Sequence, residues 1–113
     1  MERFVDYITT CYIDKDYELV GILEIDENTY IDFDRKNVYI NQVDQGVSAS
    51  QMAVLEKLIM ESPRVVTYES LYRTYYDTMY YDKEHNIQVL RNVISALKKY
   101  VRIINVSKSG YKI

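Results

Sequence analysis

The sequence has few residues of the types that build ligand loops, disulfide frameworks or metal sites. Its 113 residues include one proline, three glycines, one cysteine and one histidine. Gly21, Gly46 and Gly110 lie too far apart for a phosphate-binding glycine loop. Cys11 and His85 cannot form a disulfide framework or a structural zinc site. We therefore expect a fold stabilised by packing, with no cofactor.

Long apolar runs and a secretion signal are also missing. No segment approaches the roughly 18 apolar residues of a membrane span, and Glu2 and Asp6 stand where a signal peptide would need basic residues. A lone thiol suits a reducing compartment, so we predict a cytoplasmic protein without membrane contact. No Ser or Cys motif accompanies His85, and 17 acidic residues form close pairs by chance, so we do not expect an enzyme.

Apolar residues are plentiful and charge is unevenly distributed. A hydrophobic fraction of 48% in 113 residues is enough for the core of one domain and excludes disorder. Residues 1–84 hold all 17 acidic residues and eight of the 14 basic ones, whereas residues 85–113 hold six basic residues and no acid. This asymmetry indicates an acidic partner for the C-terminal third; a solvated helix face is the alternative.

Short β-branched and aromatic runs fill the first part of the chain. Leu19 to Ile25, Tyr30 to Phe33 and Val38 to Ile40 are separated by turn-forming residues. We predict an antiparallel sheet within residues 19–46. Residues 1–18 form another strand or a short helix, in an extension that packs on this sheet.

Three helices are predicted after the sheet, over residues 48–62, 67–76 and 84–101. Ser48 and Gln51 form a capping box for the first, and Thr67 caps the second. A Tyr- and Asp-rich loop separates the second from the third. In the third, apolar residues recur at helical spacing, and its other side is an acid-free arc of about 120°. The arc contains Gln88, Arg91, Asn92, Ser95, Lys98, Lys99 and Arg102.

The last residues have the pattern of a β-hairpin. Ile103 to Val106 and Tyr111 to Ile113 flank a Ser- and Gly-containing turn, in which Gly110 is expected to supply a positive φ. Arginine and lysine reach phosphates, and asparagine and glutamine pair with base edges in the major groove. A basic helix that leads into a hairpin is the arrangement of a winged helix.

Four ordered motifs resemble the C-terminal effector domain of OmpR/PhoB-class response regulators. The chain has VSASQMAVL (47–55) for the family's L-T-x-x-E-x-x-L-L, and SPRVVTYESL (62–71) for its x-P-x-x-v-v-s-r-e-x-L. It has LRNVISALKKY (90–100) for V-x-x-x-I-s-r-L-R-k-K, and IINVSKSGYKI (103–113) for I-x-T-V-r-g-x-G-Y-r-l. Val93, Ala96 and Ser107 depart from the pattern, since the family carries polar or arginine residues there.

The resemblance covers residues 19–113 and implies an α+β winged helix-turn-helix. That fold has a four-stranded N-terminal sheet, three helices and a C-terminal β-hairpin wing, here residues 102–113. It also implies that loop 76–84, with Asp77, Tyr80 and Tyr81, contacts RNA polymerase, and that the protein forms homodimers or binds tandem sites.

Two functions are compatible with these observations. In the first, a bacterial or phage transcriptional regulator binds double-stranded DNA, with the third helix in the major groove and the wing on the backbone or minor groove. The helix residues of the arc and the wing residues Asn105, Ser107 and Lys108 make the contacts. In the second, a winged-helix module binds RNA polymerase or another regulator without reading DNA. The acidic total and the departures at Val93, Ala96 and Ser107 favour this alternative.

Overall fold

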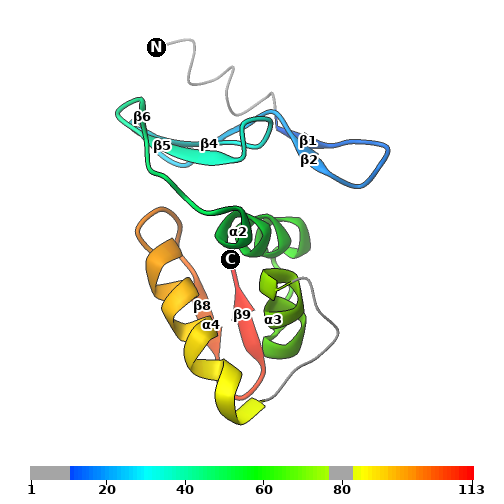
Figure 1. Ribbon diagram of the computed structural model, residues 1–113. Helices are drawn as coiled ribbons and strands as arrows, with labels where there is room; N and C mark the ends of the chain where they lie inside the picture. The colour runs from blue at the N-terminus through cyan, green and yellow to red at the C-terminus, as the bar shows by residue number, and fades with distance from the viewer. Residues whose placement is uncertain (1–10, 77–82) are drawn as a thin grey trace. The chain divides into compact units, whose positions relative to one another are not determined.

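Antiparallel strands make up the first part of the molecule, and helices with a hairpin make up the second (Figure 1). The computed structural model describes residues 11–76 and 83–113. The chain divides into two units, Met1–Ser48 (unit 1) and Ala49–Ile113 (unit 2). The α+β class and the order of elements agree with the prediction from sequence.

A four-stranded antiparallel sheet is the main element of unit 1. Its strands follow the chain in the order β3 (Ile22–Glu24), β4 (Thr29–Asp32), β5 (Asn37–Ile40) and β6 (Val43–Asp44). Ile31 lies in register with Leu23 on one side and Val38 on the other. Ile31 and Val38 are fully buried, so one face of the sheet is shielded from solvent.

Side chains and unusual backbone angles fix the turns of this sheet. The Asp26 carboxylate accepts hydrogen bonds from the backbone N–H groups of Asn28 and Thr29, at 2.8 and 2.9 Å. These bonds lower the pKa of Asp26, because they stabilise its charged form. Between β5 and β6, Asn41 and Gln42 both have positive φ, as a tight two-residue hairpin requires.

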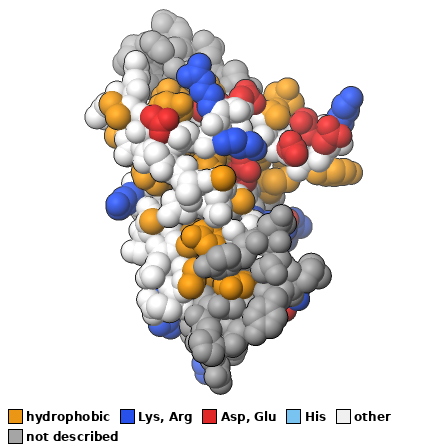
Figure 2. Space-filling model, in the orientation of Figure 1, with side chains coloured by type: hydrophobic (Ala, Val, Ile, Leu, Met, Phe, Trp, Pro, Cys, Tyr) orange, Lys and Arg blue, Asp and Glu red, His pale blue; other side chains and the backbone are white. Residues whose placement is uncertain are grey.

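The segment before the sheet forms a separate two-stranded ribbon. β1 (Tyr12–Ile13) pairs with β2 (Leu19–Val20), and acidic side chains gather over this hairpin in Figure 2. The predicted single strand from Leu19 to Ile25 is wrong, because Gly21, with a φ of 87°, interrupts it. Of the two alternatives for residues 1–18, a strand or a short helix, the structure shows a strand at Tyr12–Ile13. Both of its residues are exposed, however, so the predicted packing on the sheet does not hold for β1.

Unit 2 contains the three predicted helices. They are α2 (Ala49–Glu61), α3 (Tyr68–Tyr76) and α4 (Lys83–Leu97). Each places an apolar stripe in a common core, with side chains that are almost fully buried. The core includes Met52, Leu55 and Leu58 from α2, Leu71 from α3, and Leu90, Ile94 and Leu97 from α4.

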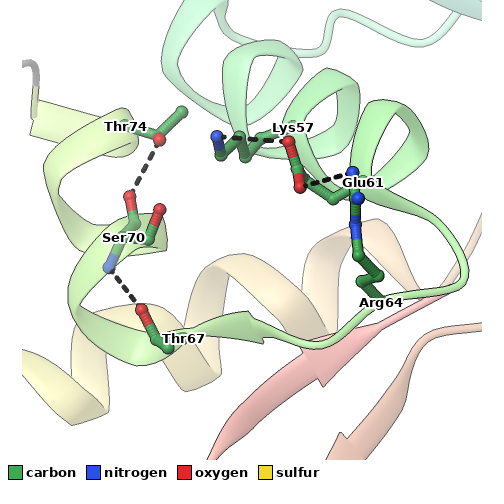
Figure 3. Close-up of polar contacts among 6 residues, drawn as sticks. All are labelled: Lys57, Glu61, Arg64, Thr67, Ser70 and Thr74. Carbon is green, nitrogen blue, oxygen red and sulfur yellow. Dashed lines mark hydrogen bonds and ion pairs between the residues drawn. The ribbon is translucent and has the colours of Figure 1, made fainter.

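Polar contacts mark the helix ends. The hydroxyl oxygen of Thr67 accepts a hydrogen bond from the backbone N–H of Ser70 at 3.1 Å, so the predicted cap of α3 is confirmed (Figure 3). At the end of α2, Glu61 forms ion pairs with Lys57 at 3.6 Å and Arg64 at 3.0 Å. α2 begins directly after Ser48, as its predicted cap requires.

The C-terminal hairpin belongs to a three-stranded sheet. β8 (Ile104–Val106) pairs with β9 (Gly110–Lys112), and β9 also pairs with β7 (Val66–Thr67). β7 was not predicted, because two residues before a helix give no periodic signal. It fixes the hairpin to the residues just before α3.

Two predictions at the C-terminal end are corrected by the structure. α4 ends at Leu97, not at residue 101, and a turn over residues 98–100 follows, in which the Tyr100 N–H donates to the Leu97 carbonyl at 3.0 Å. The hairpin residue with positive φ is Lys108, at 63°, whereas Gly110 lies within β9. Gly110 is needed for space, because a Cβ there would lie 2.7 Å from the carbonyl carbon of Val66.

Candidate nucleic-acid interface

The described part of α4 has a buried face and an exposed polar face. Leu90, Val93, Ile94 and Leu97 are at most 4% exposed, and they hold the helix against the core of unit 2. The members of the predicted arc that lie on this helix are all exposed: Gln88, Arg91, Asn92 and Ser95. The helical period therefore accounts for which residues solvent can reach.

The predicted cations that follow α4 lie in the turn over residues 98–100 or directly after it, not on the helix. Lys98, Lys99 and Arg102 are all exposed. They line an open depression of about 470 Å³, formed by residues 98–103. The backbone turns at this point, so the three positive charges surround a hollow. Such a concentration of positive charge attracts phosphate groups.

Arg91 connects the exposed face of α4 electrostatically to the hairpin. Burial raises the pKa of the Tyr111 hydroxyl, neighbouring Tyr68 raises it further, and the positive charge of Arg91 acts in the opposite direction. Tyr111 is in β9, and its ring meets the Tyr68 ring edge-on at 5.5 Å. The charge of Arg91 on α4 therefore influences a residue of the hairpin.

The three predicted wing residues have different surroundings. The Asn105 amide donates to the Tyr68 hydroxyl at 3.0 Å and to the Gly110 carbonyl at 3.3 Å, so its NH₂ group is used within unit 2. Ser107 and Lys108 are exposed in the turn between β8 and β9. Lys108 is therefore the cation that the tip of the wing presents.

The residues that depart from the family pattern also differ in position. Val93 is 4% exposed and belongs to the core, so an apolar residue there removes nothing from the exposed face. Ala96 is half-buried, and Ser107 is exposed. Ala96 and Ser107 are therefore the departures at which a side chain within reach of solvent is shorter than in the family pattern.

The predicted protein-contact residues Asp77, Tyr80 and Tyr81 lie outside the described residues. Over residues 11–76 and 83–113, no group of three or more His, Cys, Asp or Glu side chains is placed to hold a metal ion. Over the same ranges, no helix combines the length and apolar character needed to span a membrane.

Sequence reasoning missed two parts of this interface. Tyr68 and Tyr111 occur in the sequence analysis only within motifs, but in the structure their rings are in contact, and the charge of Arg91 acts on Tyr111. The hydrogen bond between Gln88 and Asn92, at 3.1 Å, was not predicted either. Their spacing of four residues on one helix was the available signal, since such side chains are neighbours.

The fold and the order of its elements define a winged helix of the OmpR/PhoB type. No protein-family model matches the chain, and no curated protein matches its sequence. Among solved structures, the DNA-binding domain of CpxR from E. coli matches with a TM-score of 0.62 and 17% identity, over 82% of this chain and 95% of that one. The resemblance to the response-regulator DNA-binding domains is thus confirmed as a likeness of fold.

Two further solved structures show the same likeness. The DNA-binding domain of Klebsiella pneumoniae RstA, crystallised in complex with the RstA box, matches with a TM-score of 0.60 and 19% identity, over 76% of this chain and 90% of that one. A streptococcal redox sensor, described as evolved from two-component response regulators, matches with a TM-score of 0.58 and 20% identity. That match covers 98% of this chain and 48% of the sensor.

Proposed function

We propose that this protein is a transcriptional regulator that binds duplex DNA. In this proposal α4 enters the major groove, and the hairpin of β8 and β9 lies on the backbone or in the minor groove. The main support is that all seven polar residues of the predicted arc are exposed, in a segment without acidic residues. The fold is also that of the RstA domain, which was crystallised with its DNA box.

The residues of the interface have different proposed roles. Gln88, Arg91, Asn92 and Ser95 face the bases or the nearest phosphates, since a helix in the major groove presents its exposed face to base edges. Lys98, Lys99 and Arg102 bind phosphates in the turn after the helix, and Ser107 and Lys108 do so from the wing. Asn105 contributes less, because its amide already donates to Tyr68 and Gly110.

Fluorescence polarisation of a labelled duplex tests the proposal. We expect binding at micromolar protein in low salt, and an affinity loss of about tenfold or more for Arg91→Ala/Lys98→Ala, because hydrogen bonds between charged groups and phosphates contribute about 1.5–3 kcal/mol each. Lys15→Ala, at an exposed cation of unit 1, is the control and should leave affinity nearly unchanged. Absence of binding by the unsubstituted protein in low salt contradicts the proposal.

The second candidate is a protein-interaction module that contacts RNA polymerase through loop 76–84. Its support is the charge of unit 1, where 11 acidic residues stand against four basic ones, because such a unit repels DNA. In a pull-down of RNA polymerase, Tyr80→Ala/Tyr81→Ala should abolish capture under this candidate, while Arg91→Ala/Lys98→Ala should not. The regulator proposal predicts loss of promoter binding with the second variant. We place both functions in the cytoplasm, and neither needs catalysis. The DNA-binding proposal includes binding as a homodimer or at tandem sites.

Thiol-based redox sensing, suggested by the streptococcal likeness, has less support. Burial raises the pKa of the Cys11 thiol, and a raised pKa lowers the fraction of reactive thiolate at neutral pH. The proposed function therefore does not include regulation through Cys11.

A further inference from the structure

Two amide side chains on the exposed face of α4 form one hydrogen-bonded unit. Gln88 and Asn92 are both exposed, and the Nε2 of Gln88 donates to the Oδ1 of Asn92 at 3.1 Å. They are separated by four residues, one turn of helix, so the bond lies along the helix axis. We refer to these two residues as the amide pair.

The hydrogen bond uses only part of the donor and acceptor capacity of the Asn92 amide. A carbonyl oxygen has two acceptor lone pairs and an NH₂ group has two donors. Gln88 uses one lone pair of Oδ1, so Asn92 still offers one acceptor and two donors. Because Gln88 holds the amide, Asn92 loses less rotational freedom when it binds a ligand.

These groups match one of the base edges in the major groove. Adenine presents the N7 acceptor and the N6 amino donor, which a single amide group can satisfy together. Guanine presents two acceptors, N7 and O6, so the Oδ1 of Asn92 would face another oxygen. The amide of Asn92 therefore discriminates in favour of adenine.

We infer that Asn92 reads an adenine in the major groove and that Gln88 acts as its positioning residue. This inference rests on the proposed function, because it requires α4 to lie in the groove. The cations at Lys98, Lys99 and Arg102 lie beyond the end of α4, where they supply affinity without base discrimination. Specificity is thus assigned to the amide pair and affinity to the turn.

Selection from a pool of randomised duplexes at fixed salt, followed by sequencing, tests the assignment to Asn92. The unsubstituted protein should enrich a motif with adenine at one position by about tenfold or more over the other bases. Asn92→Ala should lose the preference at that position alone. Asn28→Ala, which removes an exposed amide side chain of unit 1, outside the proposed interface, is the matched control and should keep it.

A double-mutant cycle tests the role of Gln88. Affinities are measured for the selected duplex and for one with the adenine pair replaced by G·C. When Asn92 is present, Gln88→Ala should reduce the ratio of the two affinities by several-fold. When Asn92 is already replaced by alanine, Gln88→Ala should leave the ratio unchanged, since a positioning residue acts only through its partner. An equal effect in both backgrounds overturns this role.

The outcomes separate this inference from the proposed function. Retention of the adenine preference by Asn92→Ala overturns the assignment. Binding of duplexes without any preference for adenine overturns it too, but leaves the proposed function standing. Failure to bind any duplex overturns both.

Discussion

Gly110 shows that a residue can be required by its surroundings and not by its own backbone angles. It is buried in β9 and pairs with Thr67 on one side and Val106 on the other. A Cβ at this position would lie 2.9 Å from the Cα of Thr67 and would overlap the carbonyl oxygen of Val66. The absence of a side chain lets β7 approach β9, and so fixes the hairpin beside α3.

We predict that Gly110→Ala destabilises the protein by about 2 kcal/mol or more, the range for overpacking a well-packed site. The neighbours of the new methyl group are backbone atoms, which cannot move aside as a flexible side chain can. The midpoint of urea denaturation measures the effect. Ser109→Ala, at an exposed turn residue, is the control and should change stability by less than about 0.5 kcal/mol. Equal midpoints for the two variants would contradict this account of the sheet.

Arg91 and the amide pair show what single residues add to the candidate interface. The positive charge of Arg91 acts on Tyr111 of the hairpin, and Gln88 holds Asn92. The spacing of four residues makes Gln88 and Asn92 neighbours on the helix, but whether they bond, and what Arg91 acts on, depends on the rotamers adopted in the folded protein. Sequence reasoning could therefore identify the residue types at the candidate site but not their partners.

At the scale of elements, the period of the apolar residues had the most predictive power. It located all three helices and the exposed side of α4, because burying a stripe of leucine and isoleucine decides how a helix packs. It failed at the end of α4, because burial continues after the helix has ended. Val101 and Ile103 follow α4, yet their side chains are buried as helical ones would be. It also could not detect β7, whose pairing partner is distant in sequence.

The turn after α4 should determine the salt dependence of DNA binding. Each phosphate contact that is lost reduces the slope of log K against log salt by about 0.9. We predict this change for Lys98→Ala, for Lys99→Ala and for Arg102→Ala, measured by polarisation titrations at several salt concentrations. Ser95→Ala should leave the slope unchanged, because serine carries no charge. A slope that none of the three substitutions alters would show that the turn does not contact phosphates.

At the scale of the whole molecule, the two units carry opposite charge. Unit 1 has 11 acidic and four basic residues, a net charge of −7, and unit 2 has six acidic and ten basic residues, a net charge of +4. The total of −3 hides this division. Overall pI is therefore a poor guide to the partner, whereas the charge of each unit is informative.

Neutralising exposed acids of unit 1 should strengthen DNA binding in low salt. Asp16 and Glu18 are exposed in the hairpin of β1 and β2. We expect Asp16→Asn/Glu18→Gln to raise affinity about twofold at 10 mM salt, where charges act over about 30 Å, and to have little effect at 150 mM. The polarisation titration at both concentrations measures this. An increase of the same size at 150 mM would contradict a long-range electrostatic origin.

The most direct test of the central claim is to map which backbone amides respond to DNA. The claim is that the exposed face of α4, the turn after it and the tip of the hairpin together contact a duplex. In an NMR titration with a short duplex, we expect the largest chemical-shift changes at residues 88–102 and 105–108. Changes concentrated in unit 1, or none at saturating protein and DNA in low salt, would contradict the account.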